Sequence, residues 1–317
     1  MSTQGSNRAV LAAFLANLGI AVAKFIGFLF TGSSAMLAES IHSAADTGNQ
    51  ALLFLGQKLS QRKATPQHPF GFGRERYFWA FVVSIVIFIL GSIFSVSEGV
   101  EKILEPSPLE DLGWAIGILM AGLLLEGWSF RTAMGEANQV RGRSTWFAFI
   151  RKSRSPELPI VLLEDSGALI GLTIALTAVS LSAWTGNPIY DGVGTVMIGL
   201  LLGAIAIILA REMRSLLIGE AAQQEDREKI VAAIEGSPHV IQLIHMRTQH
   251  LGPEEILVGA KVEFERNLTT AEIAVAVDRL EAAVRSQVPT VGPMYIEPDL
   301  MRAQLPPAPE EPTKASR

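Results

Sequence analysis

Six long apolar runs dominate this chain and constrain its fold more than any other feature. A helix needs about 20 apolar residues to cross roughly 30 Å of hydrocarbon, and the runs reach or approach that length. Of the 317 residues, 49% are hydrophobic and 18% are charged, a balance typical of membrane proteins. The runs are Val10–Phe30, Ala35–Gly56, Trp79–Ser97, Leu112–Phe130, Leu158–Trp184 and Gly192–Ala210. We therefore expect an α-helical membrane protein with a bundle of six transmembrane helices.

Basic residues in the loops indicate how these runs are oriented. The loop after the second run contains Arg74 and Arg76, and the loop after the fourth contains Arg141 and Arg143. The links after the first and fifth runs contain no Lys or Arg. Because positive loops stay on the cytoplasmic side, we expect both termini in the cytoplasm and a multi-pass protein of the plasma or inner membrane. The first run lacks a cleavage site and leads straight into the second, so we interpret it as a span.

After the sixth run the sequence takes on the pattern of a soluble domain. Apolar residues recur on one side of a helix or alternate as in half-buried strands, and Thr269 and Glu272 have capping-box spacing. The expected elements are a helix at 224–236, strands at 240–249 and 255–265, a helix at 269–287 and a strand at 294–298. This αββαβ order predicts a ferredoxin-like sheet with helices on one face. We expect a transmembrane domain at 1–215, a cytoplasmic domain at 216–302 and a proline-rich, disordered tail at 303–317.

The second run carries ionisable residues that require a functional reason, because a charge in hydrocarbon costs several kcal/mol. Glu39, His42, Asp46 and Gln50 fall on one face of a helix, since each residue advances about 100°. An imidazole and a carboxylate one turn apart can bind the same ion, and this donor pair suits zinc and its divalent neighbours. The alternative is that these groups hold neighbouring helices together by hydrogen bonds. The spacing alone does not decide between the two.

The fifth run adds further carboxylates. Glu164 and Asp165 are adjacent, so they point about 100° apart and one of them can face the bundle interior. Glu126 in the fourth run adds to the excess of acceptors, whereas the six runs contain one cation, Lys24, which we place near the end of the first run. A bound cation or protons would neutralise the excess.

Four motifs give the chain a family resemblance over nearly its whole length. They are "ESIHSAADTGNQ", "HPFGFGRERY", "EDSGALIG" and "SLLIGEA". With the expected topology they resemble the cation diffusion facilitator family of divalent-metal transporters, and within it the divergent branch that includes zinc transporter nine. The resemblance implies a homodimer with a tetrahedral metal site between the second and fifth transmembrane helices.

Residue by residue, the resemblance assigns His42, Asp46 and Asp165 as metal ligands. The fourth position of the family site is Val161 here, which has no donor atom. Water, Glu164 or Glu39 must then complete the site, and we favour Glu164.

The histidines outside the second run receive a structural interpretation. Typical family members bind regulatory metal through histidines on the strands of the cytoplasmic domain, but the matching positions are Ala260 and Tyr295. We therefore do not expect metal sensing there, although His245 remains. In the loop before the third run, His68 is a candidate for an interfacial metal site, but we favour a basic boundary of the membrane.

The sequence thus predicts a secondary transporter that exports a divalent metal, Zn²⁺ first among candidates, in exchange for protons. Its expected partners are the metal ion, protons, the lipid bilayer and a second copy of the chain, with no nucleic acid, no enzymatic activity and no tightly bound cofactor. We expect zinc as a transported substrate and not as a cofactor. Two alternatives stay open: transport of Mn²⁺, Fe²⁺ or Co²⁺ by the same mechanism, and a non-transporting membrane scaffold with a degenerate metal site.

Overall fold

The structure is a computed structural model that describes residues 18–107, 112–142 and 145–301. The chain divides into two compact units, Met1–Gly219 and Glu220–Arg317. Each unit has its own hydrophobic core, and we describe them separately.

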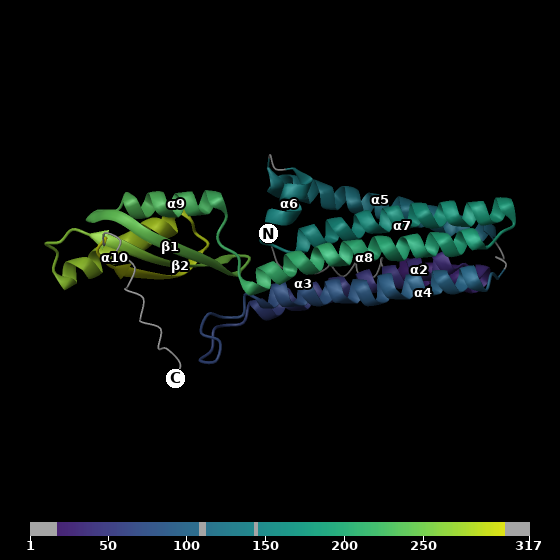
Figure 1. The fold of residues 1–317 in the computed structure, drawn as a ribbon, viewed down its shortest axis with the longest axis horizontal. Helices are drawn as coiled ribbons and strands as arrows, with labels where there is room; N and C mark the ends of the chain where they lie inside the picture. Colours follow the sequence, from purple (N-terminus) through teal and green to yellow (C-terminus); the bar gives the residue numbers. More distant parts are fainter. Residues whose placement is uncertain (1–17, 108–111, 143–144, 302–317) are drawn as a thin grey trace, which may run out of the picture. The chain divides into compact units, whose positions relative to one another are not determined.

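The first unit is a bundle of helices that run alongside one another (Figure 1). Its first described helix covers Leu18–Thr31. The elements that follow are α2 (Ser34–Ser60), α3 (Glu75–Val86), η1 (Ile87–Ile93), α4 (Phe94–Leu104), α5 (Leu112–Arg141), α6 (Trp146–Lys152), α7 (Glu157–Thr185) and α8 (Ile189–Ile218). The short helix α6 lies in the loop after the fourth run, where we expected no helix.

Four helices of the described residues are long and apolar enough to cross a membrane. They are α5, α7, α8 and the continuous helix formed by α3, η1 and α4. Helix α2 is 27 residues long, but the polar stripe lowers its hydropathy, and the run Val10–Phe30 lies partly outside the described residues. The helical membrane fold is confirmed, and the number of six spans stays a prediction.

Helix α2 is fixed at its start by a buried carboxylate of α8. Ser33 is the N-cap of α2, and its hydroxyl accepts a hydrogen bond from the Met36 backbone N–H. The same hydroxyl donates to Asp191 Oδ1 at 2.7 Å, and the Ser34 backbone N–H donates to Asp191 Oδ2 at 2.8 Å. An anion at a helix N-terminus also meets the positive end of the helix dipole. This contact fixes where the residues of α2 lie along the bundle.

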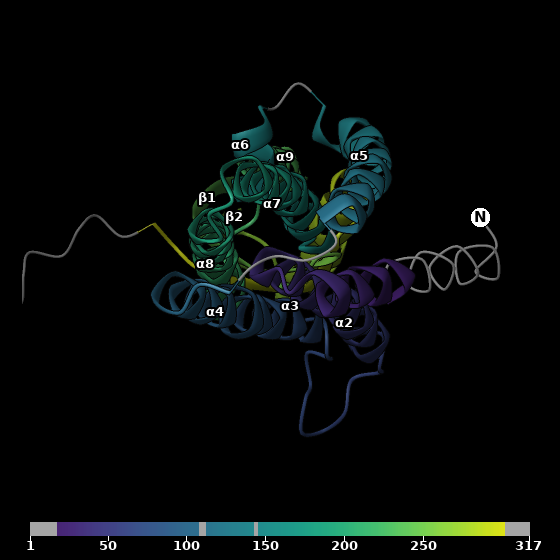
Figure 2. The same cartoon turned by 90° about the vertical axis from the view of Figure 1, so that its right-hand side faces the viewer.

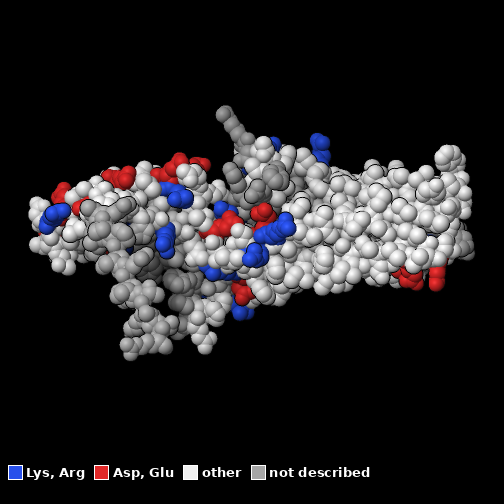
Figure 3. Space-filling model, in the orientation of Figure 1, with Lys and Arg blue, Asp and Glu red and all other residues white. Residues whose placement is uncertain are grey.

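Helix α2 contacts α3, α7 and α8, while α7 packs between α5 and α8. The view along the bundle shows α5 and α4 on opposite sides of α7 and α8 (Figure 2). Along the sides of the bundle the surface in Figure 3 is largely free of charged side chains, as expected of a surface in contact with lipid. The side of α2 that carries Glu39 and His42 is therefore buried against other helices.

The second unit has the expected αββαβ order. Its elements are α9 (Gln224–Glu235), β1 (Val240–Gly252), β2 (Glu255–Phe264), α10 (Thr270–Gln287) and β3 (Val291–Pro298). The sheet order is β1-β2-β3, with β2 antiparallel to β1 and parallel to β3. Alternate residues of β2, such as Val258 and Val262, share one core with Ile230 of α9 and Leu280 of α10, so both helices cover the same face. Strands β1 and β3 are longer than the alternation in the sequence indicated.

The predicted capping box at the start of α10 is present. The Thr269 hydroxyl accepts from the Glu272 backbone N–H, and the Glu272 carboxylate accepts from the Thr269 backbone N–H at 2.7 Å. Hydrogen bonds from Thr269, first from its backbone N–H and then from its hydroxyl, lower the pKa of Glu272, because they stabilise the ionised carboxylate. The predicted tail, 303–317, lies outside the described residues.

Candidate metal site

The polar stripe of α2 faces the interior of the bundle. The exposed fraction of the side chain is 0% for Glu39, 2% for His42 and 14% for Asp46. This placement follows from the helical period, which puts all three on one face. The three side chains are therefore largely buried among the helices of the bundle.

His42 and Asp46 are neighbours whose potential metal-binding atoms lack hydrogen bonds within the described residues. His42 Nδ1 lies 3.5 Å from Asp46 Oδ1, which is too long for a good hydrogen bond. Both ring nitrogens of His42 and Oδ1 of Asp46 are buried and have no hydrogen-bond partner among the described residues. A buried polar group without a partner costs about 1–3 kcal/mol. A cation bound between the imidazole and the carboxylate would remove that cost.

Helix α7 presents its two carboxylates to different neighbours. Glu164 is buried and faces α2, where its Oε1 accepts a hydrogen bond from Asn49 Nδ2 at 2.9 Å. Asp165 is half-buried and faces α5, where its Oδ2 accepts from the Ser129 hydroxyl at 3.3 Å. Glu164 is thus the α7 carboxylate that contacts the helix carrying His42.

Val161 packs in an apolar cluster. Its neighbours there include Phe130 and Ala133 of α5 and Phe149 of α6. The position that would carry the fourth ligand in the family pattern is therefore filled by hydrophobic packing.

Glu126 of α5 lies close enough to the ionisable residues of α2 and α7 to interact with their charges. Its charge interacts with those of His42, Asp46 and Asp165, so three helices contribute ionisable groups to one region of the bundle. Like charges repel strongly where water is scarce. The region therefore favours the uptake of a cation or of protons.

These groups do not form a closed metal site in this conformation. Within the described residues, no three His, Asp or Glu side chains are arranged to hold one ion. His42 and Asp46 are adjacent, while Glu164 is engaged by Asn49 and Asp165 by Ser129. Glu39 is engaged as well, because its Oε2 lies 3.1 Å from Lys24 Nζ. The assignment of His42, Asp46, Asp165, Glu164 and Glu39 as ligands stays a prediction.

Two residues beside the site matter more than their sequence patterns indicated. Asn49 lies three residues after Asp46, a helical spacing that could have indicated it. Lys24 was expected near the end of the first span, whereas it is fully buried and paired with Glu39. The signal for Lys24 was its charge in an apolar run, which requires a partner.

Three histidines outside α2 have local surroundings. His68 is exposed in the loop before α3 and stacks on Phe72, with 4.6 Å between the ring centroids. In the second unit His245 is exposed on β1, and His239 pairs with Glu265 at 3.0 Å. The structural interpretation of these histidines stays a prediction.

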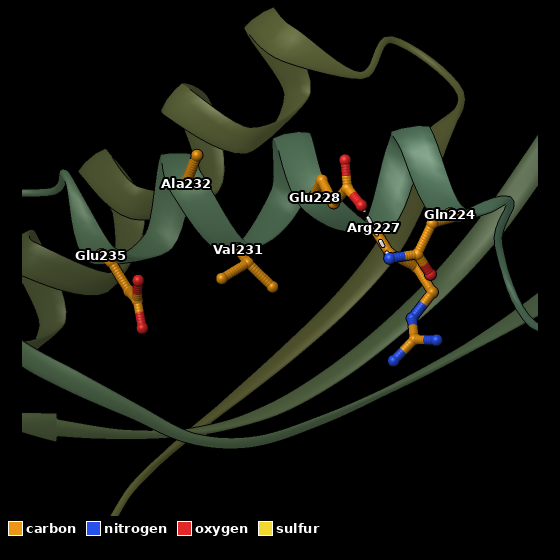
Figure 4. Close-up of a pocket in the computed structure, with 6 residues that line it drawn as sticks. All are labelled: Gln224, Arg227, Glu228, Val231, Ala232 and Glu235. Carbon is orange, nitrogen blue, oxygen red and sulfur yellow. Dashed lines mark hydrogen bonds between the residues drawn. The ribbon is translucent and has the colours of Figure 1, made fainter.

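A hollow of about 270 Å³ on α9 is a surface feature (Figure 4). Exposed polar residues line most of it, and Gln224 donates to Glu228 at 2.7 Å across one turn. Val231, half-buried, lies at its centre. Hydrated side chains of one helix provide no desolvated donor set, so the candidate site stays in the helical bundle.

The geometry and the comparison with known proteins agree on the class of this protein. The family model of the cation efflux transmembrane domain matches residues 10–218. The chain therefore belongs to the cation efflux family, the cation diffusion facilitators that its motifs resemble, and its helical unit is an integral membrane domain.

Within this family the chain is close to the branch of zinc transporter nine. It is 33% identical over 270 residues to the mouse (Mus musculus) protein "Proton-coupled zinc antiporter SLC30A9, mitochondrial", covering 84% of this chain and 47% of that protein. It is 32% identical over 266 residues to "Metal tolerance protein C4" of Arabidopsis thaliana, covering 83% of this chain and 58% of the relative. It is 24% identical over 284 residues to "Cation-efflux pump FieF" of Salmonella arizonae, covering 89% of each chain. The chain spans about half the length of the SLC30A9 protein that it matches.

Proposed function

We propose that this chain moves a divalent metal ion, Zn²⁺ in the first place, across a membrane in exchange for protons. One observation carries the proposal: His42 and Asp46 have buried polar atoms that find no hydrogen-bond partner among the described residues. Carboxylates on two other helices, α5 and α7, lie close enough to interact with them electrostatically. The name of the mouse relative, a proton-coupled zinc antiporter, supports the same substrate and coupling ion.

The proposed ligands are His42 and Asp46 from α2 and Asp165 from α7, with Glu164 as the fourth. Glu164 is favoured because it is buried and faces α2, whereas Val161 lies in apolar packing. One imidazole with carboxylates is a donor set suited to Zn²⁺. It also accommodates Mn²⁺, Fe²⁺ and Co²⁺, since it is richer in oxygen than a site with two histidines.

Proton exchange follows from the charge of the site. Several carboxylates in a water-poor bundle cannot all stay ionised without a compensating cation. Metal binding supplies that cation and releases protons, and protons that arrive from the other side release the metal. Because Glu164 and Asp165 contact different helices, a rotation of α7 relative to α2 and α5 provides a route to alternating access.

The topology and assembly are parts of the same proposal. The basic loops support cytoplasmic termini, and the family resemblance supports a homodimer. The sequence suggests the plasma or inner membrane, while the name of the mouse relative adds "mitochondrial". The transport chemistry is the same in either membrane.

Transport by the purified full-length chain in proteoliposomes tests the proposal. A zinc-sensitive dye and a pH-sensitive dye inside the vesicles report both ions, with Zn²⁺, Mn²⁺, Fe²⁺ and Co²⁺ offered separately. We expect zinc uptake with proton release from the lumen, acceleration by an acidic lumen, and loss of both signals in Asp46→Ala and Asp165→Ala. Zinc flux without proton movement would refute the coupling. Unchanged metal tolerance in cells that carry either variant would favour the scaffold alternative.

A further inference from the structure

Lys24 forms a buried ion pair inside the bundle, beside the candidate metal site. Its Nζ lies 3.1 Å from Glu39 Oε2 and donates to the Ser43 hydroxyl at 2.8 Å. Both charged side chains are 0% exposed. Removing two charges from water costs several kcal/mol per ion, and their attraction repays this only with good geometry. A packing role alone would be met by an apolar pair, so the charges need a reason.

Neighbouring helices leave room for this pair. A Cβ at Gly171 of α7 would lie 2.6 Å from Glu39 Oε1, too close for the carboxylate to stay where it is. Glu39 Oε1 is buried and has no hydrogen-bond partner among the described residues. One oxygen of Glu39 is thus neutralised by Lys24, and the other is left without a donor.

The pair is close enough to act on the metal-binding groups. The charge of Lys24 interacts with His42, Asp46 and Glu126, and its second partner, Ser43, is the residue next to His42. Glu39 lies one turn before His42 on the same face of α2. Without Lys24, the Glu39 carboxylate would be a free anionic donor beside the site.

We propose that Lys24 determines metal specificity. Its ion pair with Glu39 holds the Glu39 carboxylate in place and keeps it out of the coordination shell of the metal. This inference rests on the proposed transport of a divalent metal. With Glu39 retained, the site offers few donors and suits the four-coordinate Zn²⁺ ion. With Glu39 released, an added carboxylate makes the site richer in oxygen and favours Mn²⁺, whose ligands are mainly oxygens in octahedral geometry.

The test compares zinc and manganese affinities of the full-length protein in nanodiscs by calorimetry. The variants are Lys24→Met, which keeps the length of the side chain without its charge, and the double variant Lys24→Met with Glu39→Gln. We expect the ratio of zinc to manganese affinity to fall about tenfold in Lys24→Met, the lower end of the change in metal affinity that follows the loss of a residue controlling a ligand. In the double variant, which lacks the freed carboxylate, we expect the ratio to return to within about twofold of wild type.

The outcomes separate this inference from the proposed function. Wild-type protein that binds neither metal would overturn the proposed function. Wild-type protein that binds zinc, with an unchanged affinity ratio in Lys24→Met, would overturn the inference alone. If the ion pair is purely structural, Lys24→Met should weaken the binding of both metals equally and lower the melting temperature. That result would also overturn the inference.

If Lys24→Met does not fold, the variant Glu39→Gln tests the inference instead. In Glu39→Gln we expect the number of oxygen donors around bound zinc, measured by X-ray absorption, to equal that of wild type. Loss of an oxygen donor from the zinc shell would show that Glu39 is a ligand and would overturn the inference.

Discussion

The hydrogen bond between Asn49 and Glu164 connects α2 to α7 and gives the most quantitative prediction about the site. Asn49 is fully buried, and its Nδ2 donates to Glu164 Oε1 at 2.9 Å. A donor to a carboxylate stabilises the ionised form, which is the form that binds metal. Asn49→Ala removes this donor and leaves Glu164 in place.

The magnitude follows from the charge on the acceptor. A hydrogen bond to a charged group contributes about 1.5–3 kcal/mol, and about 1.4 kcal/mol corresponds to a tenfold change in affinity. Losing a partner that orients a metal ligand typically weakens metal binding by about 10–100-fold. We therefore expect the zinc Kd of Asn49→Ala to rise by at least about tenfold.

The assay is a zinc titration of the full-length protein in nanodiscs. Wild type, Asn49→Ala, Glu164→Gln and the double variant form a double-mutant cycle. If Asn49 acts through Glu164, Asn49→Ala changes the zinc Kd by less than about twofold once Glu164 is Gln. Gln57→Ala is the control, because Gln57 is an exposed amide on the same helix. Wild-type affinity in Asn49→Ala, or full additivity in the cycle, would refute the reasoning.

Three further predictions concern packing and pH. Leu280→Ala removes a fully buried side chain and should lower the free energy of unfolding of the C-terminal unit by about 2–5 kcal/mol, measured by urea unfolding of residues 220–301. Gly99→Ala places a Cβ 2.7 Å from the Val196 backbone nitrogen and should destabilise the bundle by about 1–3 kcal/mol, seen as a lower melting temperature, whereas Gly113→Ala, with nothing within 4 Å, should not. Because the folded-state pKa of Glu272 lies below its usual 4.5, its stabilising effect is present above that pH and is lost as the pH falls through the folded-state value. Hydrogen exchange of the first turn of α10, corrected for intrinsic rates, should show this acid-side loss of protection in wild type and not in Glu272→Gln.

The helical period explains why part of the site could be predicted from the sequence. A fixed advance of about 100° per residue places His42 and Asp46 on one face in any straight helix. The same period could not tell which of Glu164 and Asp165 faces α2, because neighbours differ by 100° and the rotation of α7 depends on its packing. The contact between Asn49 and Glu164 joins residues 115 positions apart, so no local pattern reports it.

Lys24 shows a second limit of the sequence. The first span was expected at Val10–Phe30 with Lys24 near its end, and the described helix ends close to there, at Thr31. What the sequence did not show is the partner of Lys24 across the link to α2, which begins at Ser34. The short link turns the chain back, so Lys24 and Glu39 meet between antiparallel helices. In the C-terminal unit, by contrast, the alternation of apolar residues and the capping-box spacing are local signals, and the element order was predicted from them.

X-ray absorption of the zinc-loaded, tag-free protein is the sharpest test of the proposed ligands, because it counts the donors around the metal. The chain has five histidines, and the proposed site contains one of them, His42. We expect one imidazole nitrogen with carboxylate oxygens at about 2.0–2.2 Å, and loss of the imidazole signal in His42→Ala. A zinc shell with no imidazole, or with two or more, would place the ion elsewhere and refute the proposed site.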